Sequence, residues 1–341
     1  ALPIWRLPVA EDDDATPWAA PPSRRKSEPA IEGALPQSIE VVQADQLYIA
    51  KDGLPPGLRN RMIRLAAFQN PEFHRAQAMR LSTYGKPRII GCAEDLPGHV
   101  CLPRGCIEDL RGLLGGLHVE MVVRDERFAG HPPGLEFHGE LRTDQQAAAE
   151  AMAAHDTGVL AATTAFGKTV LAAWLIARRG VNTLVLVHRQ QLLELWVDRL
   201  SQSLGLPAKR IGRLGGGRRR LTGSLDVALV QSLVRKGTVD DRIGDYGHLV
   251  IDECHHISAQ SFELAVRRAK ARFVLGLSAT VTRKDGHHPV IMMQCGAIRH
   301  RVDARAQAAA RPFTHQVIVR PPGFRAVEAP DPDRRIEFQR L

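Results

Sequence analysis

The sequence lacks long apolar runs, a secretory signal and a regular cysteine pattern. No stretch approaches the about 18 consecutive apolar residues that a membrane-spanning helix requires. The N-terminus has no basic segment followed by an apolar one, so no signal peptide is visible. Five cysteines at irregular spacing in 341 residues argue against a disulfide framework and favour a reducing compartment. We therefore expect a cytoplasmic protein, of the bacterial cytoplasm or nucleoid, without a membrane partner.

Aromatic residues are also scarce, at 5% of the chain, which argues against a base-stacking platform spread over its surface. Acidic residues are outnumbered, with 37 Asp and Glu against 46 Lys and Arg, and the net charge is +9. This basic balance favours a polyanionic partner. The hydrophobic content of 44% is that of an ordinary globular protein with a sizeable core.

Changes in composition along the chain predict a series of segments. Residues 1–37 are rich in proline and charge and indicate a flexible linker. Residues 38–127 predict a small α+β accessory domain that we expect to bind DNA. A Gly/Pro-rich linker at 128–140 leads to the main domain at 141–300. Residues 301–341 indicate a connector towards a second domain, and both ends of the chain suggest cuts within a longer protein.

The accessory domain shows strand-like and helix-like patterns in turn. Residues 39–42 and 46–49 predict two short strands, and 58–68 has the apolar spacing of a helix. Residues 86–92 and 99–105 predict a second strand pair. A further helix and strand are expected at 106–115 and 118–123.

From Leu141 onward apolar strands alternate with amphipathic helices. Such a rhythm is typical of an α/β fold with a parallel sheet covered by helices on both faces. The strands are expected at 158–163, 183–188, 226–230, 248–252 and 272–278. A further strand is predicted at 291–296.

Gly-Lys-Thr follows the first of these strands, in the stretch AATTAFGKTVLAAW at 161–174. The phosphate-loop pattern G-x-x-x-x-G-K-[ST] has a glycine where this chain has Ala162. Alanine is the smallest residue with a Cβ and fits there if its φ angle is negative. Lys168 can reach the β- and γ-phosphates of a nucleotide, and the Thr169 hydroxyl can bind Mg²⁺. The loop backbone that would wrap the phosphate is Thr164, Ala165, Phe166 and Gly167.

Polar residues also follow two later strands. Ligands of parallel sheets bind at the carboxyl ends of the strands, so these residues are expected near Lys168. Asp252 and Glu253 end the strand at 248–252, where Asp252 is expected to hold Mg²⁺ and Glu253 to activate water. Ser278 and Thr280 follow the strand at 272–278. Three signals in the expected order, each at a strand end, indicate a nucleotide site and not a chance tripeptide.

The order of these signals resembles that of superfamily 2 DExH-box helicases. The matching stretches are LRTDQQ (141–146), AFGKT (165–169), TLVLVHRQQLLELW (183–196), VQSL (230–233), DECHH (252–256) and LGLSAT (275–280). They are similar to motifs Q, I, Ia, Ib, II and III of the branch that holds the TFIIH translocase, restriction-enzyme motors and UvsW-type helicases. The whole chain also resembles helicases of TOTE conflict systems, which have a primase-polymerase domain before the motor. The stretch Arg283-Lys284-Asp285 resembles the Arg-Glu-Asp element of the TFIIH-like branch, from which Lys284 departs.

The resemblance implies a RecA-like fold, ATP and Mg²⁺ as cofactors, and roles for individual residues. Gln145 would read adenine with Arg142 nearby, while Gly167, Lys168 and Thr169 would hold phosphate and Mg²⁺. Residues that would couple the ATP state to nucleic acid are His255, Ser278 and Thr280. Residues that would contact the phosphates of the strand are Arg189, Gln231 and Ser232.

The implied activity is that of an ATP-dependent DNA helicase or translocase. In this superfamily the arginine finger comes from a second RecA-like domain, so we expect residues 1–341 alone to hydrolyse ATP near background. An RNA helicase remains an alternative, as does a nucleotide-gated DNA-binding module that recruits a nuclease or polymerase without unwinding. Displacement of a strand would separate a motor from such a module.

Some signals outside the motifs have two readings. Residues 209–220 form a basic, glycine-rich loop, in which Arg218, Arg219 and Arg220 would follow DNA phosphates unless the loop is simply solvated. Arg104, in an LPRG stretch at an expected hairpin turn, would touch duplex DNA or serve only the turn. Two groups of metal-binding residue types are interpreted as structural. They are Cys92, His99, Cys101 and Cys106, and His255, His256, His287 and His288. In the first, His99 and Cys101 alternate on one strand and no zinc-knuckle spacing is present; in the second, His255 already has a motif role.

Overall fold

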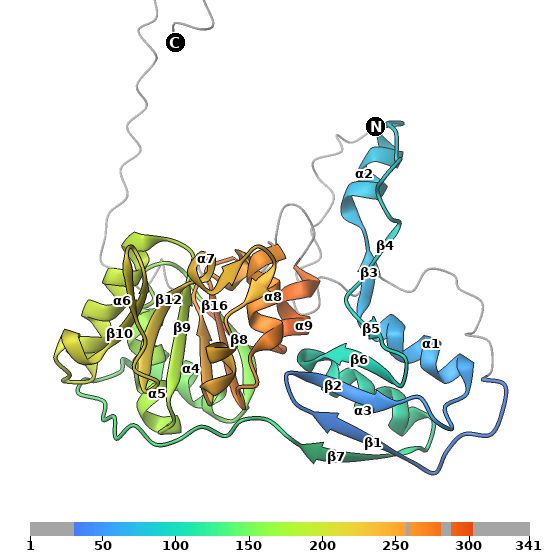
Figure 1. The fold of residues 1–341 in the computed structure, drawn as a ribbon, viewed down its shortest axis with the longest axis horizontal. Coiled ribbons are helices and arrows are strands. Elements are labelled where there is room, and N and C mark those ends of the chain that lie inside the picture. The colour runs from blue at the N-terminus through green and yellow to red at the C-terminus, as the bar shows by residue number, and fades with distance from the viewer. Residues whose placement is uncertain (1–30, 257–259, 281–287, 303–341) are drawn as a thin grey trace, which may run out of the picture. The chain divides into compact units, whose positions relative to one another are not determined.

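The structure is a computed structural model that describes residues 31–256, 260–280 and 288–302 (Figure 1). The predictions for 1–30, for 283–285 and for 303–341 lie outside the described residues. Within the described part, no helix is long and apolar enough to cross a membrane. Two large β-sheets organise the chain.

The first sheet has five strands in the order β5-β6-β2-β1-β7. β1 and β2 form an antiparallel hairpin, and β7 pairs with β1 in parallel. The strands are β1 Ser38–Gln43, β2 Gln46–Ala50, β5 Glu94–Asp95, β6 His99–Pro103 and β7 Glu120–Asp125. Helices α1 (Pro56–Leu65) and α3 (Ile107–Gly116) pack against this sheet through Leu58, Met62, Leu110 and Leu114.

The predicted second strand pair, 86–92 with 99–105, is wrong. β4 (Ile89–Gly91) pairs with β3 (Ala67–Gln69), while β6 pairs with β2 and β5. β6 is buried over four of its five residues and occupies an inner position of the first sheet. Local pattern identified the strands, but burial in the sheet decided which strand each one paired with. Helix α2 (Pro71–Ala78) lies between β3 and β4.

The second sheet has eight strands in the order β11-β10-β12-β9-β15-β16-β8-β17. The prediction of a parallel α/β sheet is confirmed, because the five expected strands are present and each pairs in parallel with its neighbours. They are β8 Thr157–Ala161, β9 Thr183–Val187, β12 Leu225–Leu229, β15 His248–Ile251 and β16 Phe273–Ser278. The outer strands are β10 Gly212–Gly215, β11 Arg218–Arg220 and β17 Ile298–Arg301. A short separate hairpin joins β13 (Val234–Arg235) to β14 (Thr238–Val239).

Successive residues of the inner strands enter two different cores. In β9, Leu184 and Leu186 belong to one core, and Val185 and Val187 to the other. This follows from the alternation of side chains across a strand, and it explains the continuous apolar sequence. One face is covered by α4 (Thr143–Ala153), α5 (Lys168–Arg179) and α6 (Gln190–Ser203). The other is covered by α7 (Val230–Leu233), α8 (Gln260–Arg268) and α9 (Pro289–Cys295).

Two further predictions of local structure are wrong. The segment expected as a strand at 291–296 is helix α9, which starts at Pro289 and has every residue buried. A short apolar run has no period that separates a buried helix from a buried strand, and proline suits a first helical turn. The basic loop is instead a hairpin, in which β11 pairs antiparallel with β10 across Gly216 and Gly217.

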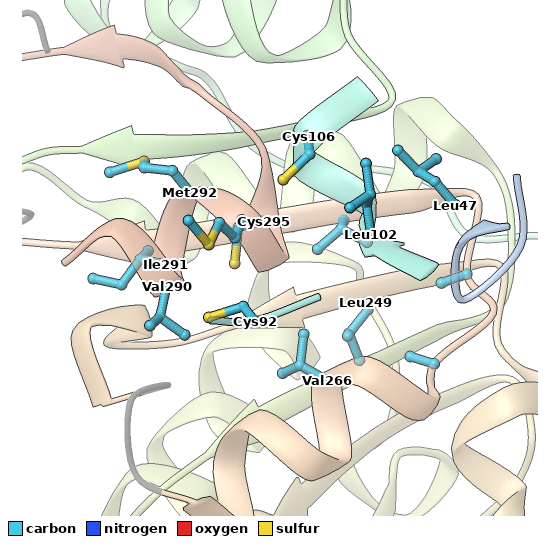
Figure 2. Packing of buried hydrophobic residues seen from close by; sticks show 14 of the residues in the cluster. Leu47, Cys92, Leu102, Cys106, Leu249, Val266, Val290, Ile291, Met292 and Cys295 are labelled. Carbon is cyan, nitrogen blue, oxygen red and sulfur yellow. The ribbon is translucent and has the colours of Figure 1, made fainter. Parts of the chain in front are cut away.

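The two sheets share one hydrophobic core. Figure 2 shows Leu102 and Cys106 of the first sheet region near Cys295 of α9, and Leu47, Val266 and Met292 belong to the same cluster. A Cβ added at Gly105 would lie 2.0 Å from the carbonyl oxygen of Met292, so the backbone itself is in contact there. One of the two hydrophobic clusters thus includes residues of both sheets, and the boundary between 38–127 and 141–300 stays a prediction.

Candidate nucleotide and nucleic-acid site

The segment 163–167 connects β8 to the first turn of α5. Gly167, at the start of α5, has φ 91°, a left-handed conformation that favours glycine. A Cβ there would also lie 2.4 Å from Nε2 of Gln145. The positive φ angle is what favours glycine at this position, since Nε2 of Gln145 is the end of a flexible side chain. The N-terminus of α5 follows at once, and such a helix end favours an anionic group.

Ala162 stands where the phosphate-loop pattern has its first glycine. The residue is 2% exposed, and its N–H donates to the carbonyl oxygen of Ser278 at 2.9 Å. Ala162 is not one of the described non-glycine residues that have a positive φ angle. The alanine therefore extends the pairing of β8 with β16 in an ordinary conformation, and no left-handed turn requires glycine here.

Lys168 is the first residue of α5 and is 8% exposed. Its Nζ donates to the carbonyl oxygen of Ala162 at 3.0 Å and lies 3.9 Å from Oε1 of Glu253. The ammonium group is thus held between the phosphate loop and the acidic end of β15. A buried cation with so few partners is suited to an anionic ligand.

Asp252 follows β15 and is 8% exposed. Its Oδ2 accepts a 2.7 Å hydrogen bond from Nε1 of Trp196, and its Oδ1 accepts the N–H of Glu253 at 3.0 Å. Burial raises the pKa of Asp252, and the Trp196 hydrogen bond acts in the opposite direction. Sequence reasoning missed Trp196, although it falls on the buried face of α6 with Leu193, Val197 and Leu200.

Glu253 has φ 47°, a left-handed conformation that is uncommon outside glycine. Its Oε2 lies 3.2 Å from Nδ1 of His255, and the hydrogen bond from His255 holds the pKa of the Glu253 carboxyl below its ordinary value. Unusual backbone angles that the surrounding structure maintains are frequent at functional sites. The carboxylate is thus kept ionised beside Lys168.

The three residues predicted to couple ATP state to nucleic acid lie together. His255 Nδ1 is 3.0 Å from Oγ of Ser278. The Ser278 hydroxyl donates to the carbonyl oxygen of Thr280 at 2.8 Å and accepts the Thr280 N–H at 3.2 Å. A continuous set of contacts therefore runs from Glu253 to the segment after β16.

Gln145 and Arg142 both contact the carbonyl oxygen of Phe166. Gln145 Nε2 donates to it at 2.8 Å and Arg142 at 2.9 Å. Oε1 of Gln145 accepts the backbone N–H of Arg142 at 3.0 Å, so the amide joins the start of α4 to the phosphate loop. Both residues brace the loop, and the adenine-reading role of Gln145 stays a prediction.

The remaining predicted nucleotide contacts lie where the sequence put them. Thr164 and Ala165 are exposed in the loop, Phe166 is buried, and Thr169 lies in the first turn of α5. The hydroxyl of Thr169 and the carboxylate of Asp252 are hard oxygen donors of the kind that Mg²⁺ prefers. The donor set on these elements therefore fits the magnesium ion that the sequence implies.

A group of three histidine rings in tilted contact, which sequence reasoning missed, adjoins this site. The ring of His256 lies 4.2 Å from that of His188 and 4.3 Å from that of His255. His188 follows β9, and burial together with the neighbouring Arg189 lowers its pKa. The three rings thus lie between the end of β9, which His188 follows, and the end of β15, which precedes His255 and His256.

The predicted nucleic-acid contacts of the main domain are mostly exposed. Arg189 is exposed at the start of α6, and the exposed Gln231 donates to the carbonyl oxygen of His188 at 3.1 Å. Arg218, Arg219 and Arg220 are exposed on β11. A cavity of about 290 Å³ is lined by both Ser232 and Arg219. Arg235 and Arg242, which the sequence did not single out, line the same cavity.

The prediction for Arg104 is wrong in two respects. The residue lies in a 3-10 helix, Arg104–Cys106, and not at a hairpin turn, and its side chain is 3% exposed. It donates to the carbonyl oxygens of Val266 at 2.9 Å and Ala269 at 2.6 Å, at the end of α8. Burial lowers its pKa to about 10. The guanidinium joins the two sheet regions and is not available to duplex DNA.

The described residues hold no group of three or more metal-binding side chains. All five cysteines are free and buried, so they pack as small apolar residues. His287 lies outside the described residues.

Part of the chain is similar to a known family and to named helicases. Residues 138–283 match the family model described as Type III restriction enzyme, res subunit. The chain is 28% identical over 201 residues to the DNA 3'-5' helicase XPB of Mycobacterium tuberculosis, covering 57% of this chain and 34% of that protein. It is 29% identical over 170 residues to a mimivirus protein provisionally named an ATP-dependent RNA helicase, covering 49% and 32%. The chain thus spans about a third of the length of these relatives.

A solved structure resembles both sheet regions. The UvsW helicase of bacteriophage T4 aligns with a TM-score of 0.57 at 16% identity, over 76% of this chain and 99% of that one. At this identity the likeness concerns the fold alone. The matched family model and the XPB-type relatives agree with the motif order, and residues 138–283 are similar to the N-terminal half of superfamily 2 helicases.

Proposed function

We propose that this chain binds ATP with Mg²⁺ and couples ATP hydrolysis to movement on, or remodelling of, DNA. The observation that carries the proposal is the convergence of Lys168, Asp252 and Glu253 at one edge of the parallel sheet. Lys168 and Glu253 come within 3.9 Å although they lie on different elements. A cation, a buried carboxylate and an ionised carboxylate beside a helix N-terminus are the groups that phosphoryl transfer needs.

Each residue of this site has a proposed role in ATP hydrolysis. Lys168 exchanges its bond to the Ala162 carbonyl oxygen for the β- and γ-phosphates. Thr169 and Asp252 would hold Mg²⁺, which supplies neutralisation of the phosphate charge. Glu253, whose pKa is lowered by His255, orients the attacking water and accepts its proton.

DNA is the proposed substrate because the XPB relative is named a DNA helicase and the exposed arginines on β11 suit phosphates of any sequence. An RNA substrate is the second candidate, since the mimivirus relative is named for RNA. We propose further that hydrolysis needs an arginine from a second RecA-like domain, as phosphoryl transfer benefits from such a residue by about 10³–10⁵ in rate. We also propose a nuclease or primase-polymerase partner. This part of the proposal rests only on the resemblance to known helicases.

The test combines nucleotide binding with strand displacement by the full-length protein. Lys168→Ala should greatly weaken the affinity for ATP–Mg²⁺ in a folded protein, whereas Lys209→Ala, an exposed lysine on the surface, should not. Glu253→Gln should bind ATP but abolish turnover. Displacement of a labelled DNA strand that requires both Lys168 and Glu253 supports a motor.

Other outcomes would replace this proposal. ATP-dependent DNA binding without displacement would indicate a clamp, and displacement confined to RNA would indicate an RNA helicase. Unchanged nucleotide affinity in Lys168→Ala would refute the assignment of the site.

A further inference from the structure

Residues 67–91 form an arm with its own small sheet. β3 and β4 pair only with each other among the described strands, in the register Ala67 with Gly91 and Gln69 with Ile89. α2 and the segment that follows it connect the two strands. Figure 1 shows α2 at the end of the β3–β4 ribbon.

The arm is built around a buried asparagine. Asn70 is 5% exposed, and its Oδ1 accepts the N–H of Glu72 at 3.0 Å, which caps α2. Its Nδ2 donates to the carbonyl oxygen of Pro87 at 2.7 Å, and its N–H donates to that of Arg88 at 3.0 Å. One residue thus joins the outgoing and the returning chain, so the arm has a defined shape.

The arm exposes large apolar side chains in the segment after α2 and on β4. Tyr84 is 95% exposed, Met79 63%, Leu81 61% and Ile89 58%. These are four of the ten exposed large hydrophobic residues in the described part of the chain. Gathered exposure of this kind marks an interaction surface and not a packed core. A tyrosine ring so exposed has both of its faces open to a flat ligand.

The same segment is basic. Residues 67–91 contain Arg75, Arg80, Lys86 and Arg88 against a single acidic residue, Glu72. Arg80, Lys86 and Arg88 are exposed, and no ion pair involving them occurs within the described residues. Tyrosine and arginine also occur in protein-binding surfaces, whereas lysine is depleted there. The excess of four basic residues over one acidic residue suits a polyanionic partner. The charge and the ring together favour a nucleic acid over a protein.

We propose that the arm binds DNA where the two strands separate, with Tyr84 stacked on an unpaired base and Arg80, Lys86 and Arg88 on the flanking phosphates. Base faces are accessible only outside the duplex, so the ring gives the arm a preference for unpaired nucleotides. The phosphate contacts are independent of sequence. This inference rests on the proposed function for its choice of DNA, but the binding itself requires no ATP.

The test measures binding of the full-length protein without nucleotide to two labelled DNAs, a fork with unpaired arms and a blunt duplex of equal length. Tyr84→Ala should weaken binding to the fork about 10-fold, in line with loss of one stacked base, and leave the blunt duplex unchanged. Tyr84→Phe keeps the ring and should retain binding to the fork. Because Tyr84 is almost fully exposed, the melting temperature should not change in either variant.

The triple reversal Arg80→Glu, Lys86→Glu and Arg88→Glu should weaken binding to both DNAs and lower the slope of log affinity against log salt by about 0.7–0.9 per lost contact. The control is Arg111→Glu, an exposed arginine on α3, which should change neither quantity. Unaltered fork binding in both arm variants would overturn the inference. So would a Tyr84→Ala variant that binds the fork normally but loses affinity for vesicles of phosphatidylserine.

Different results would refute DNA binding by the arm and the proposed motor function. Lys168→Ala removes nucleotide binding but should keep the preference for the fork, because the arm lies outside the phosphate loop. A protein that prefers forked DNA through Tyr84 yet displaces no strand would refute the motor and leave the arm. A motor insensitive to Tyr84 and to the triple reversal would refute the arm alone.

Discussion

The indole Nε1 of Trp196 donates a 2.7 Å hydrogen bond to Oδ2 of Asp252. The donor lies on α6 and the acceptor lies at the end of β15, and both side chains are buried. An indole N–H can only donate, so it stabilises the ionised form of the carboxylate. The contact fixes Oδ2 of Asp252, while Oδ1 accepts the backbone N–H of Glu253 at 3.0 Å.

Trp196→Phe should weaken Mg²⁺-dependent nucleotide affinity by about 10-fold, because partners that orient a metal ligand typically contribute 10–100-fold. The aromatic volume is nearly kept, so the protein should still fold. Isothermal titration of ATP with and without Mg²⁺ measures the effect. Trp174→Phe on α5, where the side chain is half-buried, is the matched control. Equal affinities in the two variants would show that the hydrogen bond has no role in the site.

His248 should make folding stability sensitive to acid. It is fully buried, its Nε2 lies 2.7 Å from Arg179, and its Nδ1 lies 3.4 Å from the Thr183 hydroxyl. Arginine can only donate, so Nε2 accepts and the ring is neutral. Burial and the Arg179 charge hold the pKa of His248 well below its ordinary value of 6.5.

The unfolded chain therefore takes up a proton near pH 6.5 that the folded chain refuses. Stability is fully present above the ordinary pKa and falls as the pH drops below it, by at most about 1.4 kcal/mol per pH unit from this residue. Urea unfolding from pH 8 to pH 5 measures the fall. His248→Gln should show a shallower dependence than the wild type. Parallel curves for the two proteins would contradict the account.

Charge reversal at Arg218, Arg219 and Arg220 should weaken binding to all DNA sequences alike. The three residues are exposed on β11. Within the described residues, only Arg218 of the three forms an ion pair, in which its Nη1 lies 4.0 Å from Oε1 of Glu194. Each lost phosphate contact should lower the salt slope by about 0.9 for duplex DNA. Fluorescence anisotropy at several salt concentrations gives the slope, with Arg111→Glu as the control. A slope that does not change would mean that the β10–β11 hairpin is merely solvated.

Arg104→Ala should destabilise the fold by roughly 2–4 kcal/mol, since it leaves a cavity and removes one donor from each of two carbonyl oxygens. Those oxygens belong to Val266 and Ala269 at the end of α8. Chemical denaturation measures the change. Arg111→Ala, at an exposed position of α3, should lie within about 0.5 kcal/mol of the wild type. An Arg104→Ala protein as stable as this control would show that the buried guanidinium contributes nothing net.

Interaction partners far apart in sequence escaped prediction. Arg104 finds its acceptors 162 and 165 residues away, and Trp196 finds Asp252 at a separation of 56. Periodicity reports which face of an element is buried but not which element covers it. For the same reason the sequence predicted strands at 86–92 and 99–105 and paired them wrongly.

The sequence by itself determined the α/β sheet of the main domain and the nucleotide-site elements that lie at its strand ends. Those features are local, because apolar runs, a left-handed glycine and polar residues after strands depend on near neighbours alone. Tertiary structure alone decided the rest. It paired β4 with β3, made α9 a helix and buried Arg104 beneath α8. These outcomes depend on burial against segments that are distant in sequence. Burying polar groups costs free energy, and the contacts that offset this cost form only when the whole core has assembled.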